Sequence, residues 1–347
     1  MPLARLSLEG DATFILGGNG AGKTSLLEAM SLVSAMRSFR TGDPRTMIRL
    51  GAKSAKVFCT LSHERDGDAS IEIGLGHGAR TVRMDGNPLE RVSDLVGRFP
   101  TAVLSSQDIQ LVRGSPTSRR RFVDMMVASA DRMYFEALRR YGKALAGRNS
   151  LLKSRSSSVA EIAAFEKPLA DAACVVVSLR GKALGELGAL VKETYSAIVP
   201  AGEIPELVYR PDFEETTPEK VLELFAESRE KDMAKGATTV GPHLDDFEPR
   251  LNGRLARDYA SEGQQRGLVL ALRLAEAEWL GARTLAEPVI LADDIMGELD
   301  PARREAFWKI LGGKSQVVAT GTEIPAAEAR DGRFRVVKIA EIVAPEA

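Results

Sequence analysis

The chain has 347 residues, of which 44% are hydrophobic and 27% charged, which is enough for one large domain or two ordinary ones. Its formal net charge of −1 excludes a nucleic-acid binder that is basic over its whole surface, but permits a local basic patch. Cys59 and Cys174 lie in apolar sequence, and no segment is long and apolar enough to span a bilayer, so we expect a cytoplasmic protein with no membrane partner.

The first third of the chain predicts strands around one helix. Residues 3–8 and 13–16 are expected to be short strands, and residues 23–36 a helix. Residues 54–84 alternate between polar and apolar side chains, which predicts antiparallel strands closed by the turn at residues 85–87. Residues 103–107 have the character of a strand end.

The middle of the chain is helical. Apolar and basic residues recur at helical spacing over residues 117–153, a polar loop follows, and a second helical stretch covers residues 159–199. Two long helices joined by a short loop indicate a helical hairpin. A further helix is predicted over residues 218–231, after which strands are expected to resume near residue 237.

Strands and helices alternate again toward the end of the chain. Asn252-Gly253 is a hairpin signal, and an apolar helix, a strand over residues 288–294, a helix over residues 301–311 and another strand follow. The fold class is therefore expected to be α/β. The simplest organisation is a discontinuous nucleotide-binding domain, residues 1–115 and 236–347, with an inserted helical arm at residues 116–235.

The sequence GGNGAGKT has the spacing of a phosphate-binding P-loop, and it follows an apolar strand and opens a helix. Glycines allow backbone N–H groups to surround phosphates, and the helix dipole favours the anion. Lys23 is expected to reach the β and γ phosphates of ATP, and Thr24 to hold Mg²⁺. The alternative is a glycine-rich turn before an ordinary helix. The predicted nucleotide-binding residues are Gly17, Gly18, Asn19, Gly20, Ala21, Gly22, Lys23 and Thr24.

The strand at residues 288–294 ends in two acids, Asp293 and Asp294. Asp293 is expected in the Mg²⁺ shell, and Asp294 is expected to polarise the water that attacks the γ-phosphate. Taken alone, a strand that leaves the core into a solvated acidic turn would explain the pair as well. The P-loop earlier in the chain favours the functional interpretation.

The stretch YASEGQQRG opens an apolar helix with a polar turn. Ser261 can cap that helix, and the simplest alternative leaves Gln264 and Gln265 solvated. A Ser-x-Gly-Gln turn shortly before an acidic strand, in a chain with a P-loop, resembles the signature of ABC-type ATPases. That resemblance implies that the turn binds the γ-phosphate held by a partner subunit, through the physics that also serves a helix cap.

Beyond these motifs, the chain resembles the RecF family, relatives of the Rad50 and SMC ATPases. The matching stretches are LLEAMSLVSAMRSFRT, VRGSPTSRRRFVD, GRNSLLK, VGPHLDDF, ASEGQQRGLVLALRLAE and ILADDIMGELDPARR. The resemblance implies that Gln107 is the Q-loop glutamine that senses Mg²⁺ and the attacking water, and that Ser261, Gly263 and Gln264 form the signature turn. Asp300 matches the D-loop, although it could equally cap the helix at Pro301.

The chain departs from the family pattern at three places. The strand and N-F-R-like segment that usually precede the P-loop are missing, which is expected to affect recognition of the adenine. Leu244 stands where arginine is usual, and Thr320 or Thr322 stands at the switch position that other ATPases fill with histidine.

The resemblance implies an ATP-dependent homodimer that binds double-stranded or gapped DNA, works with RecO and RecR in loading RecA during recombinational repair, and hydrolyses ATP weakly. A set of basic residues could together line a DNA channel, although a solvated helix face explains any single one of them better. The set comprises Arg37, Arg40, Arg45, Arg119, Arg120, Arg121, Arg139, Arg140, Lys143, Arg148 and Lys153. The alternatives are an ATPase subunit of a transporter or SMC-like system, and a DNA scaffold that does not hydrolyse ATP.

Overall fold

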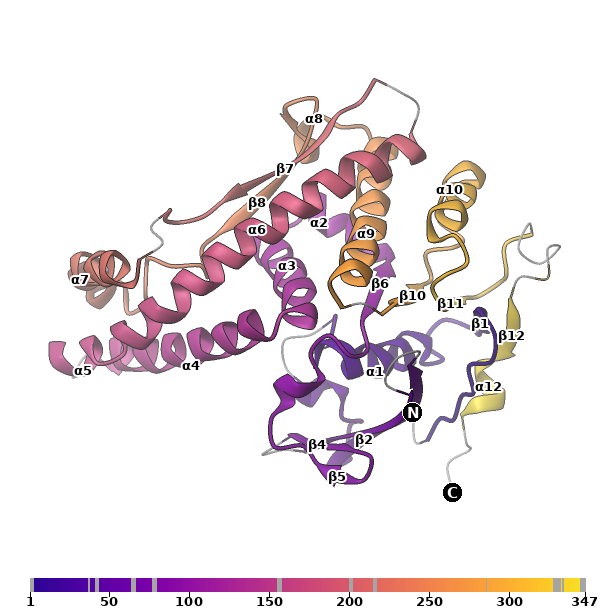
Figure 1. Cartoon of the computed structure of the whole chain (residues 1–347), viewed down its shortest axis with the longest axis horizontal. Helices are drawn as coiled ribbons and strands as arrows, with labels where there is room; N and C mark the ends of the chain where they lie inside the picture. Colours follow the sequence, from indigo (N-terminus) through magenta and orange to yellow (C-terminus); the bar gives the residue numbers. More distant parts are fainter. Residues whose placement is uncertain are drawn as a thin grey trace. The chain divides into compact units, whose positions relative to one another are not determined.

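The computed structural model describes residues 3–36, 38–40, 44–63, 67–76, 80–154, 158–199, 202–214, 217–284, 286–326, 332 and 334–343. The chain divides into two compact units (Figure 1). Unit 1 comprises Met1–Asp108, Glu193–Ala201 and Arg266–Ala347, and unit 2 comprises Ile109–Lys192 and Gly202–Gln265. The predicted division at residues 115/116 and 235/236 concerns functional domains and stays a prediction.

A five-stranded parallel sheet forms the centre of unit 1. Its strand order is β12-β1-β11-β10-β6, with every neighbouring pair parallel. The strands are β1 (Ala12–Leu16), β6 (Thr101–Ser105), β10 (Val289–Asp293), β11 (Val317–Gly321) and β12 (Arg335–Lys338). Parallel strands place their carboxyl ends at one edge, so the residues that follow β1, β6, β10 and β11 emerge together there.

Helices pack on this sheet because their apolar faces match its buried strands. The described residues of unit 1 form the helices α1 (Lys23–Ala35), α10 (Pro301–Leu311), α12 (Ile339–Ile342), α9 (Glu262–Thr284) from Arg266 onward and the end of α6 (Glu166–Ile198) from Glu193. Leu27 of α1 is fully buried with Ile15, Leu291 and Val318 of three strands. The P-loop helix is therefore anchored directly on the strands that deliver the polar residues.

A second, antiparallel sheet in unit 1 confirms the alternation seen in residues 54–84. It contains β2 (Ser54–His63), β3 (Gly67–Gly76), β4 (Arg80–Met84) and β5 (Asn87–Pro88) in that order. Asp85 and Gly86 adopt positive φ angles of 50° and 77° in the predicted turn between β4 and β5. Unit 1 also contains the short 3₁₀ helices η1 (Pro44–Met47), η2 (Val92–Leu95) and, up to Asp108, η3 (Ser106–Ile109).

Unit 2 is mainly helical. Its helices are α2 (Gln110–Arg113), α3 (Pro116–Ala130), α4 (Arg132–Ser154), α5 (Val159–Ala163), α6 (Glu166–Ile198, up to Lys192), α7 (Pro218–Lys235) and α8 (Ala256–Tyr259). Three antiparallel strands, β7 (Pro205–Arg210), β8 (Asp246–Leu251) and β9 (Arg254–Leu255), form its sheet. Apolar residues of α4, α6 and α7 share one buried cluster.

The structure corrects several predicted elements. Residues 3–8 form only an isolated bridge between Ala4 and Val343, not a strand. The helix predicted over residues 117–153 is two helices, because the Asp131 side chain accepts the Tyr134 N–H at 2.9 Å and starts α4 anew. Nor do strands resume at residue 237: side-chain oxygens, not a neighbouring strand, accept the backbone N–H groups of Thr238 and Thr239.

The described helices are also too short or too polar to cross a membrane. Of the two cysteines, Cys174 is buried and Cys59 half-buried, and both are free thiols.

Candidate functional site

The P-loop connects β1 to α1 and depends on glycine at defined positions. Gly20 and Gly22 have φ angles of 77° and 98°, and Gly22 begins α1 without any side-chain cap. A Cβ at Gly17 would lie 2.5 Å from the Ile339 Cγ2 atom of α12. The loop thus leaves the backbone N–H groups of the first helical turn without a side-chain cap, as an anion site at a helix start requires.

The Lys23 ammonium group is buried within this loop. Its side chain is 4% exposed, and Nζ donates to the carbonyl oxygens of Gly17 at 2.8 Å and Gly18 at 3.2 Å. Nζ also lies 3.8 Å from Oδ1 of Asp294. A positive charge is therefore held where the loop, the helix start and the acidic strand end meet.

Asp293, at the end of β10, joins three elements through one carboxylate oxygen. Its Oδ1 accepts the hydroxyls of Thr24 on α1 and Thr320 on β11, each at 3.0 Å. Burial raises the pKa of Asp293 above its ordinary value, and the two hydrogen bonds offset part of that rise. The predicted Mg²⁺ residues Thr24 and Asp293 are thus brought together by the parallel sheet.

The next residue, Asp294, has an unusual backbone. Its φ of 54° is in the left-handed region, and its N–H donates to Thr320 Oγ1 at 3.1 Å. Such conformations cost free energy in a non-glycine residue and are retained where the surroundings impose them. Thr320 therefore holds both acids, whereas Thr322, the other candidate for the switch position, is exposed.

Gln107 lies in η3, directly after β6, and is exposed. Its neighbour Asp108 is buried, and accepts the Ser105 N–H at 2.7 Å and an ion pair from Arg273 of α9 at 2.5 Å. Arg273 also pairs with Glu276 at 2.7 Å. These contacts tie the end of β6 to α9 and therefore fix the turn that carries Gln107.

This cluster of Asp108, Arg273 and Glu276 was not predicted. Burial raises the pKa of Glu276 to about 7, although the Arg273 charge acts in the opposite direction. Burial alone would lower the pKa of Arg273, but the charges of Asp108 and Glu276 raise it above the usual value. An arginine and a glutamate three residues apart on an otherwise apolar helix face were the available sequence signal.

The signature turn is a capping box at the start of α9. Ser261 Oγ accepts the Gln264 N–H at 3.3 Å, and Gln264 Oε1 accepts the Ser261 N–H at 2.7 Å. Ser261 remains exposed, and Gly263 is half-buried. The turn belongs to unit 2, whereas the P-loop, Asp293, Asp294, Gln107 and Asp300 belong to unit 1.

Gln265 is not solvated, in contrast to the simplest alternative for this turn. It is 5% exposed, and its Nε2 donates to the carbonyl oxygens of Ala260 at 2.9 Å and Ala256 at 3.1 Å. Its Oε1 accepts a hydrogen bond from Arg113 Nε of α2. The polar cluster that opens α9 therefore holds the preceding chain as well as the helix start.

Asp300 caps α10. Its side chain accepts the Arg303 N–H at 2.9 Å and also pairs with the Arg303 guanidinium. This contact accounts for the aspartate at the start of the helix, and its D-loop role stays a prediction.

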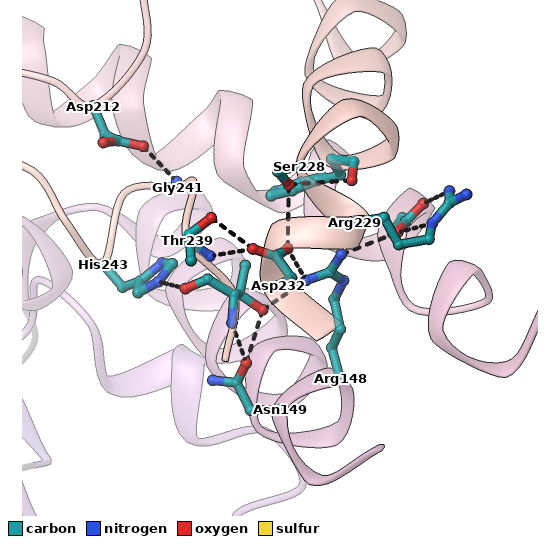
Figure 2. Close-up of polar contacts among 12 residues, drawn as sticks. Arg148, Asn149, Asp212, Ser228, Arg229, Asp232, Thr239, Gly241 and His243 are labelled. Carbon is teal, nitrogen blue, oxygen red and sulfur yellow. Dashed lines mark hydrogen bonds and ion pairs between the residues drawn. The ribbon is translucent and has the colours of Figure 1, made fainter. Parts of the chain in front are cut away.

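Two of the basic residues considered for DNA contact are structural. Arg148 is fully buried in unit 2, where it pairs with Asp232 at 2.6 Å and Glu166 at 3.1 Å (Figure 2). Arg119 is 3% exposed and makes a bidentate pair with Asp246 at 2.7 and 2.8 Å. Neither guanidinium is available to a phosphate, whereas Arg139, Arg140, Lys143 and Lys153 are exposed. Arg37 lies outside the described residues.

The VGPHLDDF stretch stabilises unit 2. His243 Nε2 contacts the Thr238 carbonyl oxygen at 3.0 Å and Nδ1 contacts the Tyr141 hydroxyl at 2.6 Å, so Nδ1 is the acceptor. Asp245 is buried and accepts hydrogen bonds from Arg180 and Tyr209. Leu244, which replaces the usual arginine, is 45% exposed.

The site chemistry fits a nucleotide with a divalent cation. Among the described residues no group of three or more His, Cys, Asp or Glu side chains could hold a metal alone. Mg²⁺ commonly takes one or two protein ligands and completes its shell with phosphate oxygens and water. The pairing of the Thr24 hydroxyl with the Asp293 carboxylate provides ligands of that kind.

Comparison with known proteins places the chain in a described family. The family model described as "RecF/RecN/SMC N terminal domain" matches residues 4–341. The chain is 34% identical to the DNA replication and repair protein RecF of Synechococcus sp. (strain JA-3-3Ab), over 94% of this chain and 89% of the relative. It is 37% identical to the RecF protein of Geobacter metallireducens, over 89% and 86% of the two chains.

Solved structures agree with the sequence matches. A structure described as the recombination mediator protein RecF-ATP in the RecFOR pathway has a TM-score of 0.83 and 30% identity, and the match covers 92% of this chain and 88% of that one. A second RecF structure, with ATPrS, has the same TM-score and covers 96% and 91%. The chain therefore belongs to the RecF family of DNA replication and repair proteins, with the predicted α/β fold of a P-loop ABC-type ATPase.

Proposed function

We propose that this protein binds ATP and Mg²⁺, dimerises with ATP bound, and grips double-stranded or gapped DNA during recombinational repair. The observation that carries the proposal is the convergence of Lys23, Thr24, Asp293 and Asp294 at one edge of the parallel sheet. The solved RecF structures described with ATP and ATPrS support the choice of nucleotide. The ATPase domain is proposed to comprise residues 1–115 and 236–347, with residues 116–235 as an inserted arm.

Each residue of the proposed nucleotide site has a defined task. The loop from Gly17 to Gly22 presents backbone N–H groups to the phosphates, and Lys23 neutralises their charge. Thr24 and Asp293 hold Mg²⁺, which when bound polarises the phosphoryl oxygens. Asp294 orients the attacking water, and Gln107 senses the water and the metal. We expect slow hydrolysis, which opens the dimer.

Dimerisation is proposed to depend on the signature turn. Ser261, Gly263 and Gln264 lie at the N-terminus of a long helix, where the helix dipole stabilises anions. In the proposed dimer Ser261 of each copy contacts the γ-phosphate bound to the other, and Asp300 crosses the same interface. The triphosphate then acts as a ligand shared by two copies.

Substitution of Ser261 tests this proposal. Ser261→Arg should abolish ATP-dependent dimerisation in sedimentation velocity with a non-cleavable ATP analogue. Ser261→Asp and Ser261→Asn form a matched pair, because both side chains cap helices as well as serine does. Aspartate adds a negative charge against the phosphate, so it should weaken the dimer at least about tenfold relative to asparagine. Equal dimerisation of the two variants would refute the proposed role of Ser261.

Family membership supports the proposed DNA binding and repair partners. The exposed residues Arg139, Arg140, Lys143 and Lys153 are proposed to contact duplex phosphates, which attract basic side chains without regard to sequence. RecO and RecR are proposed as partners in loading RecA, and the cytoplasm as the place of action.

Two other functions are weaker candidates. A transporter ATPase would need a surface that couples to membrane helices, together with the L-S-G-G-Q turn and switch histidine that this sequence lacks. In a scaffold that does not hydrolyse ATP, Asp294 would have no attacking water to orient. A single-turnover ATP assay with and without gapped DNA separates this scaffold from the proposed ATPase, because only the ATPase releases phosphate.

A further inference from the structure

A carboxylate contacts the signature turn from outside the motif. The Gln264 side chain donates from Nε2 to Oε1 of Glu203 at 2.8 Å, while its Oε1 accepts the Ser261 N–H at 2.7 Å. A carboxylate can only accept and a backbone N–H can only donate, so these two partners determine the orientation of the carboxamide. Both polar atoms of the Gln264 carboxamide, Nε2 and Oε1, thus form hydrogen bonds in this structure.

The backbone next to Glu203 is held by the sheet of unit 2. The next residue, Ile204, exchanges two hydrogen bonds with Asn252, its N–H donating to Oδ1 and its carbonyl oxygen accepting the Asn252 N–H, both at 2.8 Å. Pro205 then begins β7 and pairs with Leu251 of β8. Glu203 is therefore held next to the start of α9 by the strand that follows it.

The negative charge of Glu203 opposes association of the proposed dimer. The N-terminus of α9 favours one nearby anion, and the Glu203 carboxylate already lies against its first turn. The γ-phosphate of a partner-bound nucleotide would require the same end of the helix. Since like charges at short range repel, phosphate and carboxylate compete for this helix end.

We propose that Glu203 is a positioning residue that restrains the signature turn, by holding Gln264 and by opposing the partner's triphosphate. This inference rests on the proposed ATP-dependent dimer and assigns it a regulator. Closure of the dimer brings the partner's triphosphate toward this carboxylate, so two copies associate only when the nucleotide contacts outweigh the repulsion. Glu203 thereby raises the dissociation constant of the dimer without contacting the P-loop.

The test compares Glu203→Gln, Glu203→Ala and the control Glu206→Gln in the full chain. Glutamine at position 203 keeps an acceptor for Gln264 and removes the charge, whereas Glu206 lies on β7, opposite Arg250, and the same change there leaves the Gln264 contacts intact. Dimer dissociation constants are measured by sedimentation with a non-cleavable ATP analogue at low and high salt. The affinity of the single copy for the analogue is measured at a dilution where no dimer forms.

Glu203→Gln is expected to tighten the dimer about two- to fivefold at low salt, with a smaller gain at high salt. Glu203→Ala should also tighten it, Glu206→Gln should leave it unchanged, and the affinity of the single copy should stay constant. A dimer of Glu203→Gln that is no tighter than wild type would overturn the inference, as would a purely structural pattern in which only Glu203→Ala weakens it. If wild-type protein does not dimerise with nucleotide, or Ser261→Arg dimerises normally, the proposed function itself fails.

Discussion

Replacement of Arg148 by methionine should destabilise unit 2 rather than weaken DNA binding selectively. Methionine has a similar length but no charge, so the change leaves Asp232 and Glu166 buried without their shared cation (Figure 2). Their side chains are 0% and 2% exposed, respectively, so water cannot replace the lost partner. Removal of one partner from a buried ion pair typically costs about 3–5 kcal/mol. The remaining Arg229 pair of Glu166, at 2.7 Å, places the expected loss near the lower end of that range.

The assay is urea unfolding followed by far-ultraviolet circular dichroism, with Arg139→Met as the matched control on the same helix. Arg139 is exposed, so its replacement should change the free energy of unfolding by less than about 0.5 kcal/mol. The same control should weaken duplex binding and reduce its salt dependence. A loss below about 1 kcal/mol for Arg148→Met would refute the assignment of this arginine to the buried network.

Two further changes test unit 1. Gly17→Ala would force a Cβ against Ile339. The variant should lose about 1–3 kcal/mol of the free energy of unfolding in thermal or urea unfolding, and it should bind the ATP analogue more weakly. Unchanged stability and affinity would show that the close approach of Gly17 to Ile339 is unimportant. The pKa of Glu276 is raised from 4.5 to about 7, so between these values the folded state binds more protons than the unfolded state and stability falls as pH rises. Glu276→Gln should remove this dependence of the free energy of unfolding on pH, which amounts to at most about 3 kcal/mol. The free energy is measured by urea unfolding of both proteins at pH values from 4.5 to 7. If it changed with pH equally in the two proteins, the raised pKa of Glu276 would be refuted.

The P-loop was predictable because its structure is local. The spacing of Gly17, Gly22, Lys23 and Thr24, after an apolar strand and before a helix, requires no knowledge of distant contacts. The meeting of Thr24 and Asp293 was also predictable, because parallel strands bring their carboxyl ends to one edge. By contrast, the bridge that Thr320 makes to both acids depends on the strand order β1-β11-β10, which the sequence does not specify.

The arm shows where sequence reasoning failed. Helical periodicity indicates which side of a helix an arginine occupies, but not whether an acid from another segment covers it. Arg148 follows the basic pattern of α4, yet its partners come from α6 and α7, at sequence separations of 18 and 84 residues. The acceptors of Gln265 could not be identified from the sequence for a related reason, because they are carbonyl oxygens of the chain that folds back before α9.

In the proposed dimer two copies share the nucleotide, and each completes the site of the other. Sedimentation velocity of the wild-type chain with a non-cleavable ATP analogue and Mg²⁺, over a range of protein concentrations, tests it most directly. A monomer without nucleotide that becomes a dimer with it, and fails to do so when Ser261 is arginine, is the expected result. Single chains at every concentration in the presence of saturating analogue would contradict the claim.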